Sequence, residues 1–479
     1  MDYASRVRYS DFRQACRAHK PSELLPYLAS FSARKNGLGK LQIDVMKSTP
    51  PWTVAAIARE SLLWGNEHRD KPVTWAAVAK LFNLIRNVEV VPEQTSLMRI
   101  MTPIVQEQFA YWRSPQVEMA RALAVLDTSW PGLPDLDWTK VFGMSLAEMI
   151  RATELVGVAA VQMDGRVDLG RLFGPGMERV ATDLLPREEA DLALRYLTRT
   201  PQEHKAEAQA AGVLDARAGE YAYNPLRSAP FVDFGDGVPI SPEPRLIWQA
   251  ITMGTLYYVG PKYFGDKKFH TDLGHRMSHY VGQQLQQIEG AEVFPELAYD
   301  SQNAMTIDWF VVLPEVVLLV ECKSARLNAM GLTGDEEALS KTVARYFDKA
   351  RQQIDTTARH VQRGEPRLGR VPLDRPLLGI TVTAEDIYMA NYLMKEFGQD
   401  AVTPTLVASL AEIEAMVTLP TAEIGKRLVA ICADAEQSTW SLKQSLGEGM
   451  DPRRNALLTR VRERSNFLRD EAGHRATDS

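Results

Sequence analysis

The hydrophobic pattern of this chain changes its period part-way along, and that change limits the folds open to the chain. Up to about residue 215, apolar residues recur three and four positions apart, as in residues 53–64, 73–85 and 117–126. This spacing is typical of amphipathic helices that bury one face. From about residue 266, helical segments alternate with apolar runs of strand length. The sequence therefore predicts a large, mostly α-helical domain followed by a mixed α/β core.

Two positions in the helical region have the features of helix starts. Thr74 and Ser145 each precede a segment of helical period, and Ser145 is followed three positions later by Glu148, which is the spacing of a capping box. The region shows no convincing repeat at solenoid periods and no cluster of catalytic side chains. We therefore assign residues 1–215 to a helical N-terminal domain with a recognition or regulatory role.

The middle and the end of the chain differ from that region. Residues 221–244 are rich in proline, glycine and aromatic residues and lack helical period, whereas residues 245–258 return to helical spacing. We place an extended connector with its helix at residues 216–265 and the α/β core at residues 266–412. Residues 413–479 are interpreted as a helical extension that ends in an arginine-rich tail.

The order of the elements in the core is the next constraint. Residues 272–288 carry one apolar stripe and predict a helix. Three strands are expected after it, at residues 291–299, 304–313 and 316–323. The later elements are a long helix, a strand, a helix and a strand, at residues 335–362, 377–383, 385–397 and 403–410. This order is typical of an α/β sandwich.

Charged residues interrupt two of these apolar strands. Asp308 stands among the apolar residues of the second strand, and Glu321 and Lys323 end the third. Because side chains alternate along a strand, Glu321 and Lys323 share one face while Cys322 points to the other. A tight connection at Pro314 would make the two strands antiparallel neighbours and would bring Asp308 level, or nearly level, with Glu321.

Two carboxylates and an ammonium group at the end of a sheet suit metal-dependent phosphodiester chemistry. Mg²⁺ takes a pair of carboxylates from a protein and fills its remaining positions with water and phosphate oxygens. A bound metal lowers the pKa of a water molecule and neutralises charge on the phosphodiester. Lys323 could orient the attacking water, stabilise the transition state or act as a base, and the sequence leaves these roles open.

The three residues and their spacing resemble the PD-(D/E)XK nuclease superfamily, also called restriction-endonuclease-like. Its pattern is an aspartate followed by a strand-borne Glu-x-Lys in an αβββαβ core. Here the pattern is Asp308 and, thirteen residues on, Glu321-Cys322-Lys323. The resemblance covers residues 272–410, under a third of the chain. It implies that Asp308 and Glu321 are metal ligands, with Mn²⁺ able to replace Mg²⁺, and that Lys323 is the catalytic lysine.

The resemblance adds two residues and shows two departures. Gln353, preferred over Gln352, matches a site-facing glutamine that many relatives carry on the following helix, and Glu296 resembles an acidic position that some relatives have near the metal. Ile307 replaces the proline that often precedes the aspartate. Ser278 stands where the opening helix often carries a glutamate, which implies weaker metal binding, replacement by Glu296, or a degenerate site.

Charge is distributed unevenly along the chain. The formal net charge is −6 and the isoelectric point about 5.9, so the chain as a whole is no basic nucleic-acid binder. Residues 323–375, by contrast, hold eleven Lys or Arg against seven Asp or Glu, which favours a polyanion near the site. Nucleic-acid backbone contacts are expected on one helical face, from Arg345, Lys349, Arg351 and Arg359. His275 and His279 lie four apart without a third metal ligand, which indicates a partly exposed helix face; the alternative is that one of them contacts a phosphate.

The cysteines and the apolar segments limit the setting. The three cysteines are far apart and include no CxxC pair, which disfavours a zinc site or a disulfide framework. The N-terminal segment lacks the apolar core of a signal peptide, and no apolar run is long enough to span a membrane. We therefore expect a cytoplasmic protein without a membrane partner.

The favoured interpretation is a Mg²⁺-dependent nuclease that acts on DNA, with a protein partner or a second copy bound through the helical domain. By analogy with other nucleases that carry helical extensions, it is an effector of bacterial defence against phage or plasmids. One alternative is an RNA nuclease or a DNA-repair nuclease with the same site, because metal ligands do not read the sugar. The other is a catalytically inactive nucleic-acid-binding or scaffold protein with a decayed nuclease fold.

Overall fold

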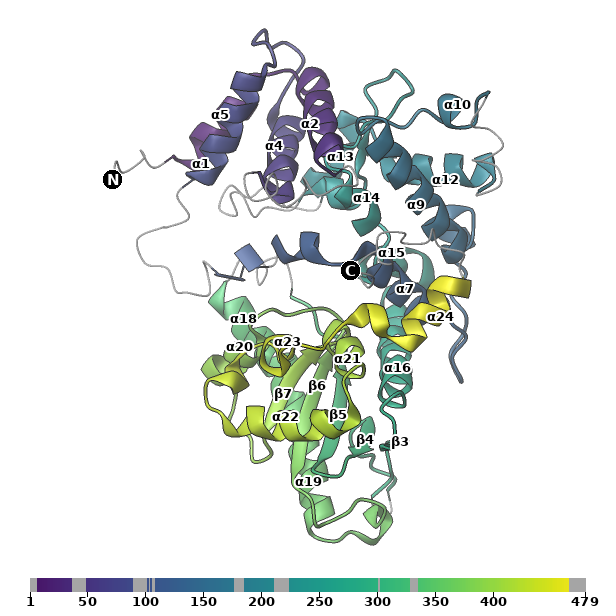
Figure 1. Ribbon diagram of the computed structural model, residues 1–479, viewed down its shortest axis with the longest axis vertical. Helices are drawn as coiled ribbons and strands as arrows, with labels where there is room; N and C mark the ends of the chain where they lie inside the picture. The colour runs from purple at the N-terminus through teal and green to yellow at the C-terminus, as the bar shows by residue number, and fades with distance from the viewer. Residues whose placement is uncertain are drawn as a thin grey trace, which may run out of the picture.

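The helices and the strands of the chain are largely segregated along the sequence. The computed structural model describes residues 7–36, 49–88, 101–102, 104–105, 108–175, 185–210, 224–299, 302–327 and 335–464. Most of the described structure before residue 290 is helical, and a five-stranded sheet follows on the C-terminal side. In Figure 1 the purple and blue helices lie mostly in the upper half, and the green sheet lies in the lower half. The expected mixture of a helical part and an α/β part is therefore confirmed.

The predicted helix starts in the first part are confirmed by their hydrogen bonds. The Thr74 side chain accepts a hydrogen bond from the backbone N–H of Ala77, and Ser145 and Glu148 form a reciprocal capping box. The described helices of this part are α1 (Tyr9–Cys16), α2 (Pro21–Asn36), α4 (Pro51–Trp64), α5 (Trp75–Arg86), α7 (Pro115–Leu126), α8 (Thr139–Phe142), α9 (Leu146–Gln162), α10 (Leu169–Leu172), α12 (Arg187–Leu197) and α13 (Pro201–Ala210).

The connector is extended only in part, because its described portion begins with a 3-10 turn, η3 (Pro225–Arg227). Its strand β2 (Phe231–Val232) pairs in parallel with β1 (Thr198–Arg199). Residues 245–258 lie in two helices, α14 (Arg245–Gln249) and α15 (Met253–Phe264), rather than in one. The helices are separated because Thr252 is extended and its hydroxyl donates to the Gln249 carbonyl. The boundary expected near residue 215 lies outside the described residues.

The sheet has the strand order β3-β4-β5-β6-β7. The first three strands are antiparallel and the last three are parallel. Their bounds are β3 (Glu292–Pro295), β4 (Trp309–Val312), β5 (Val317–Lys323), β6 (Leu377–Thr383) and β7 (Thr405–Ser409). The helices around the sheet are α16 (Asp266–Leu285), α18 (Glu336–Thr342), α19 (Lys349–Gln362), α20 (Ala390–Phe397), α21 (Leu410–Met416), α22 (Thr421–Ala433), α23 (Leu442–Leu446) and α24 (Ala456–Arg464).

Strand β5 shows how alternation builds the two layers that cover the sheet. Leu318 and Val320 belong to the cluster of buried residues that includes Tyr280 of α16. Val317 and Leu319 belong to another cluster, which includes Ile354 of α19. Because successive side chains point to opposite faces, α16 covers one face of β5 and α19 covers the other.

Several elements differ from the expectation in their bounds. The helix expected at residues 385–397 begins only at Ala390, after Met389 with a φ of 65°. The long helix expected at residues 335–362 contains a π-helical turn, η4 (Val343–Asp348), between α18 and α19. A π turn has one residue more than an α turn, so the side chains after it are rotated relative to those before it. A prediction from ordinary α-helical spacing therefore assigns residues before and after η4 to the wrong relative faces of the helix.

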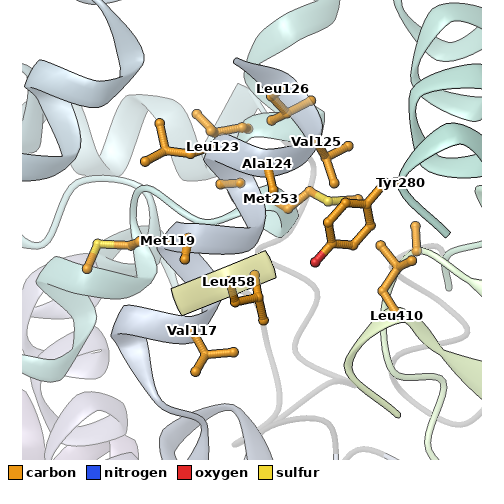
Figure 2. Packing of buried hydrophobic residues seen from close by; sticks show 14 of the residues in the cluster. Val117, Met119, Leu123, Ala124, Val125, Leu126, Met253, Tyr280, Leu410 and Leu458 are labelled. Carbon is orange, nitrogen blue, oxygen red and sulfur yellow. The ribbon is translucent and has the colours of Figure 1, made fainter. Parts of the chain in front are cut away.

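The helical part and the α/β part share a hydrophobic core. Side chains of α7, α16 and the sheet belong to one cluster of buried residues. In Figure 2 the Tyr280 ring of α16 lies between Val125 of α7 and Leu410 of α21. The yellow helix α24 also packs against α7, as Figure 1 shows (upper right of the sheet). Helix α7 thereby joins the first part of the chain to the sheet.

Candidate active site

The register of the sheet brings the two predicted carboxylates together. Trp309 is paired with Val320 in the antiparallel β4–β5 ladder, so Asp308, one residue before β4, is level with Glu321. The tight connection expected at Pro314 is present, since the Leu313 N–H donates to the Val316 carbonyl over 2.9 Å. The predicted alignment of the two acids is therefore confirmed.

A β-bulge precedes Asp308 and accounts for the shortness of β4. Pro295 pairs with Trp309, and Ala298 pairs with Met305. Between these two pairs the segment that continues from β3 has three residue steps, whereas the segment that leads into β4 has four. The extra residue leaves the backbone N–H of Ile307 outside the ladder, where it donates to Thr357 Oγ1 of α19 over 3.2 Å. Bulges of this kind redirect the neighbouring side chain and end regular pairing.

Asp308 is held by hydrogen bonds to both carboxylate oxygens. Its Oδ2 accepts from the backbone N–H of Cys322 over 2.7 Å, and its Oδ1 accepts from Ser278 Oγ over 3.2 Å. Ser278 is fixed in turn by the Trp309 indole N–H, which donates to the Ser278 carbonyl over 2.9 Å. Ser278, which replaces the expected glutamate, therefore orients Asp308 rather than supplying a charge.

Glu321, Lys323 and Gln353 form a connected group beside Asp308. The Lys323 ammonium donates to Glu321 Oε1 over 2.5 Å and to Gln353 Oε1 over 2.6 Å. Glu321 is only 4% exposed. Cys322, between the two charged residues, packs against the opposite cluster on the α16 side of the sheet. The predicted alternation and the choice of Gln353 on α19 agree with this geometry.

Burial and mutual repulsion make this an unfavourable place for two bare negative charges. Burial, followed by the neighbouring charge of Asp308, raises the pKa of Glu321 to about 7, although the Lys323 ammonium opposes that rise. Burial also raises the pKa of Asp308, against the hydrogen bond from the Cys322 N–H. A cation between these carboxylates would favour the ionised form of both, so the pair suits a positively charged ligand.

Glu296 and His275 lie at the margin of the site. The Glu296 N–H donates to the Asp308 carbonyl over 2.9 Å, and its exposed carboxyl has a pKa raised by partial burial and by the Asp308 charge. His275, which is exposed on α16, opposes these shifts and favours a lower pKa for both Glu296 and Asp308. In the described ranges, no three His, Cys, Asp or Glu side chains gather closely enough to hold a metal. A metal here would therefore rest on Asp308 and Glu321, with water and phosphate completing its shell.

The four expected nucleic-acid contacts do not share one environment. Arg345, Lys349 and Arg359 are exposed. Arg351 is half-buried, and its Nη1 donates to the Gln399 carbonyl over 2.5 Å. Burial lowers the pKa of this guanidinium. Arg351 thus connects α19 to the loop after α20, whereas the other three cations face solvent.

Sequence reasoning missed the groups that support Asp308. Thr357 accepts the hydrogen bond of the bulged N–H, the Cys322 N–H donates directly to the Asp308 carboxylate, and Trp309 acts on that carboxylate through Ser278. Part of the signal was in the sequence: Gly282 lies one turn after Ser278 and allows the Trp309 ring to approach the helix. The bulge has no comparable signal, since it depends on a partner fifty positions away.

Comparison with models of protein families gives no match for this chain, and comparison with curated proteins gives none either. Among the helices that the structure describes, none has both the length and the apolar character needed to cross a bilayer. The site is therefore interpreted from its own geometry.

Proposed function

We propose that this chain is a Mg²⁺-dependent nuclease with a restriction-endonuclease-like core, and that it hydrolyses phosphodiester bonds in DNA. The observation that carries the proposal is the convergence of Asp308, Glu321 and Lys323 at one end of β4 and β5. A buried acid pair beside an ammonium group is costly unless the charges are used. The αβββαβ order of the elements from α16 to β7 supports the same proposal.

Asp308 and Glu321 would hold the metal, and Mn²⁺ could replace Mg²⁺. When bound, such an ion lowers the pKa of a water molecule and neutralises charge on the phosphodiester. The raised pKa values of both acids fit this assignment, because each reflects a negative charge that lacks sufficient compensation. Ser278 and the Cys322 N–H keep the Asp308 carboxylate oriented while it binds.

Lys323 supplies the charge-stabilising group. Its ammonium is fixed between Glu321 and Gln353, so it is oriented before a substrate arrives. From this position it donates a hydrogen bond to a phosphate oxygen or to the attacking water. Gln353 positions Lys323 through its side-chain oxygen and is itself exposed.

The decisive experiment combines cleavage with metal binding. Purified protein is incubated with plasmid, linear duplex, single-stranded DNA and RNA, in Mg²⁺, Mn²⁺ or EDTA. We expect cleavage of DNA with either metal and none in EDTA. Lys323→Ala should lower the rate by at least about a hundredfold, the usual cost of removing a preorganised charge-stabilising group.

The matched control is Glu337→Ala, which removes an exposed carboxylate that pairs with Lys341 on α18. It should leave cleavage unchanged. Mg²⁺ should raise the unfolding temperature of the wild type and of Glu337→Ala, because a ligand that binds only the folded state stabilises it. Asp308→Ala and Glu321→Ala should lose this effect. A protein that neither cuts a nucleic acid nor responds to the metals is a scaffold with a decayed site.

The proposal extends to the biological setting. We propose that the protein acts in the cytoplasm as an effector of bacterial defence, and that its helical part receives the signal that releases cleavage. The contacts of α7 with α15 and α16 give that part a direct path to the site. Expression of the wild type in a bacterial host should lower plasmid recovery, and Lys323→Ala should restore it. Equal recovery with both proteins would contradict this role.

A further inference from the structure

Two adjacent tyrosines of α15 expose ring surface to solvent. Tyr258 is 59% exposed, and Tyr257 is half-buried beside it, with the two rings edge to face at a centroid distance of 5.1 Å. An exposed tyrosine ring offers an apolar face and a polar hydroxyl to a ligand. The candidate active site assigns no role to either ring.

Arg326 connects these tyrosines to the catalytic strand. Its guanidinium lies 3.9 Å from the centroid of the Tyr257 ring and forms an ion pair with Glu385. It is only three residues beyond Lys323, and three residues of extended chain span at most about 10 Å. The backbone of Arg326 therefore lies within about 10 Å of the backbone of Lys323, and the Arg326 guanidinium packs on the Tyr257 ring.

The π-helical turn η4 brings a second pair of residues to the same place. The guanidinium of Arg345 lies 5.0 Å from the centroid of the Tyr346 ring. Both residues are close enough to Tyr257 to affect its pKa, which is raised mainly by burial. Arg345 is exposed, and within the described part of the chain no carboxylate forms an ion pair with it. Its positive charge is therefore available to an anion.

We propose that a tyrosine–arginine patch binds a single-stranded nucleic acid and delivers it to Lys323; its exposed members are Tyr258 and Arg345, with the half-buried Tyr257 and Tyr346 and the buried Arg326 packed beside them. The inference rests on the proposed nuclease function and names its substrate class. Exposed tyrosine rings accept unpaired bases by stacking, and an uncompensated arginine accepts the phosphate backbone. A duplex keeps its base faces inside the helix, so it cannot use the rings.

The few uncompensated charges of the patch indicate that stacking, rather than ion pairing, would hold a single-stranded nucleic acid. Glu385 already compensates Arg326, which leaves Arg345 as the exposed cation of the patch. Few phosphates are then neutralised, so affinity should depend only weakly on salt concentration.

The test is binding in EDTA, which removes cleavage from the measurement. Fluorescence anisotropy of labelled oligothymidine, oligouridine and a duplex is measured with the full-length wild type, Tyr258→Ala, Tyr258→Phe and Arg345→Ala. Tyr258→Ala should weaken the binding of single strands by about tenfold or more, because one stacked base contributes that much. Tyr258→Phe should retain the affinity. The oligothymidine and oligouridine arms distinguish DNA from RNA.

The matched control is Tyr263→Ala, which removes a 47% exposed tyrosine of the same helix outside the patch. It should leave the affinity unchanged. The proposal is overturned by equal losses in Tyr258→Ala and Tyr263→Ala, by normal binding in Tyr258→Ala, or by a duplex that binds more tightly than either single strand. A loss in Tyr258→Phe as large as in Tyr258→Ala overturns stacking as the source of affinity.

Binding and cleavage measured on the same variants distinguish a failure of the patch from a failure of the nuclease site. If metal-dependent cleavage of a duplex persists while patch variants bind single strands normally, the patch fails and the nuclease stands. If single strands bind through Tyr258 but no nucleic acid is cut in Mg²⁺ or Mn²⁺, the nuclease proposal fails and the binding surface stands. Unfolding temperatures of the variants confirm that each one is folded.

Discussion

A single glycine determines how closely the opening helix of the core approaches the candidate site. At Gly282, a Cβ atom would lie 2.1 Å from the Trp309 ring, far inside van der Waals contact. The same indole donates to Ser278, which orients Asp308. The absence of a side chain at position 282 therefore allows the contact that connects α16 to the aspartate.

Gly282→Ala should destabilise the protein by about 1–3 kcal/mol, the usual cost of inserting a methyl group into a packed contact. It should also weaken metal binding, because Trp309 must move and Ser278 moves with it. The measurement is the chemical unfolding midpoint, together with the shift in unfolding temperature on adding Mg²⁺.

Gly274→Ala provides the comparison, since a Cβ atom at this position of the same helix meets nothing within 4 Å. That variant should be neutral or should gain up to about 1 kcal/mol from the higher helix propensity of alanine. If both substitutions had the same effect, helix propensity and not the Trp309 contact would explain the result.

The sequence predicted the helices and strands that follow from a local hydrophobic period. It missed the features that depend on residues far away in the chain. The starts of α5 and α9 followed from capping residues, and β6 was expected with the bounds that it has. The alignment of Asp308 with Glu321 followed from alternation and a short turn. The bulge at Ile307 and the π turn η4 were missed, because each is a one-residue irregularity that periodicity averages out.

Helix α13 carries a histidine whose protonation opposes folding. His204 is fully buried, and burial lowers its pKa from the ordinary 6.5 to about 4. Between these two pH values the unfolded chain binds a proton at this residue, and the folded chain does not. Stability therefore falls as the pH decreases from 6.5 to about 4 and is unaffected by this residue above that range.

The histidine should account for about 3 kcal/mol of the stability lost across this range, since each unit of pKa corresponds to about 1.4 kcal/mol. The difference in unfolding midpoint between pH 7 and pH 4 should be smaller in His204→Gln than in the wild type. The exposed His68, changed to Gln, should behave as the wild type does. An unchanged pH dependence in His204→Gln would show that the folded protein accommodates a charge at this position.

At the scale of the whole molecule, a buried ion pair joins the helical part to the α/β part. Arg121 of α7 donates to both carboxylate oxygens of Glu414 in α21 over 2.6 Å, across 293 positions of sequence. Tyr280 of α16 donates to the same carboxylate over 2.6 Å. These residues lie in the shared hydrophobic core, so the pair connects the two parts where water is excluded. No local pattern could have indicated such a contact.

Removing one partner of this ion pair should lower the free energy of unfolding more than replacing both partners. Glu414→Met alone should destabilise the protein by about 3–5 kcal/mol, because Arg121 loses its bidentate partner in a buried place. The double variant Arg121→Met/Glu414→Met should recover part of that loss, because both buried charges of the pair are removed, while Glu118 loses its own bond to Arg121. Both effects are measured as unfolding midpoints in a double-mutant cycle. The exposed pair Arg195–Asp191 provides the control and should contribute at most about 1 kcal/mol.

The same cycle tests whether the two parts of the molecule unfold together. If α7 is an integral part of the core, Glu414→Met should shift one cooperative transition, seen equally by tryptophan fluorescence and by circular dichroism. If the helical part folds independently, the variant should split unfolding into two steps that the two probes report differently. The continuous cluster from α7 through α16 to the sheet favours the first outcome. In that case α7, α16 and the Ser278–Asp308 contact belong to one cooperative unit.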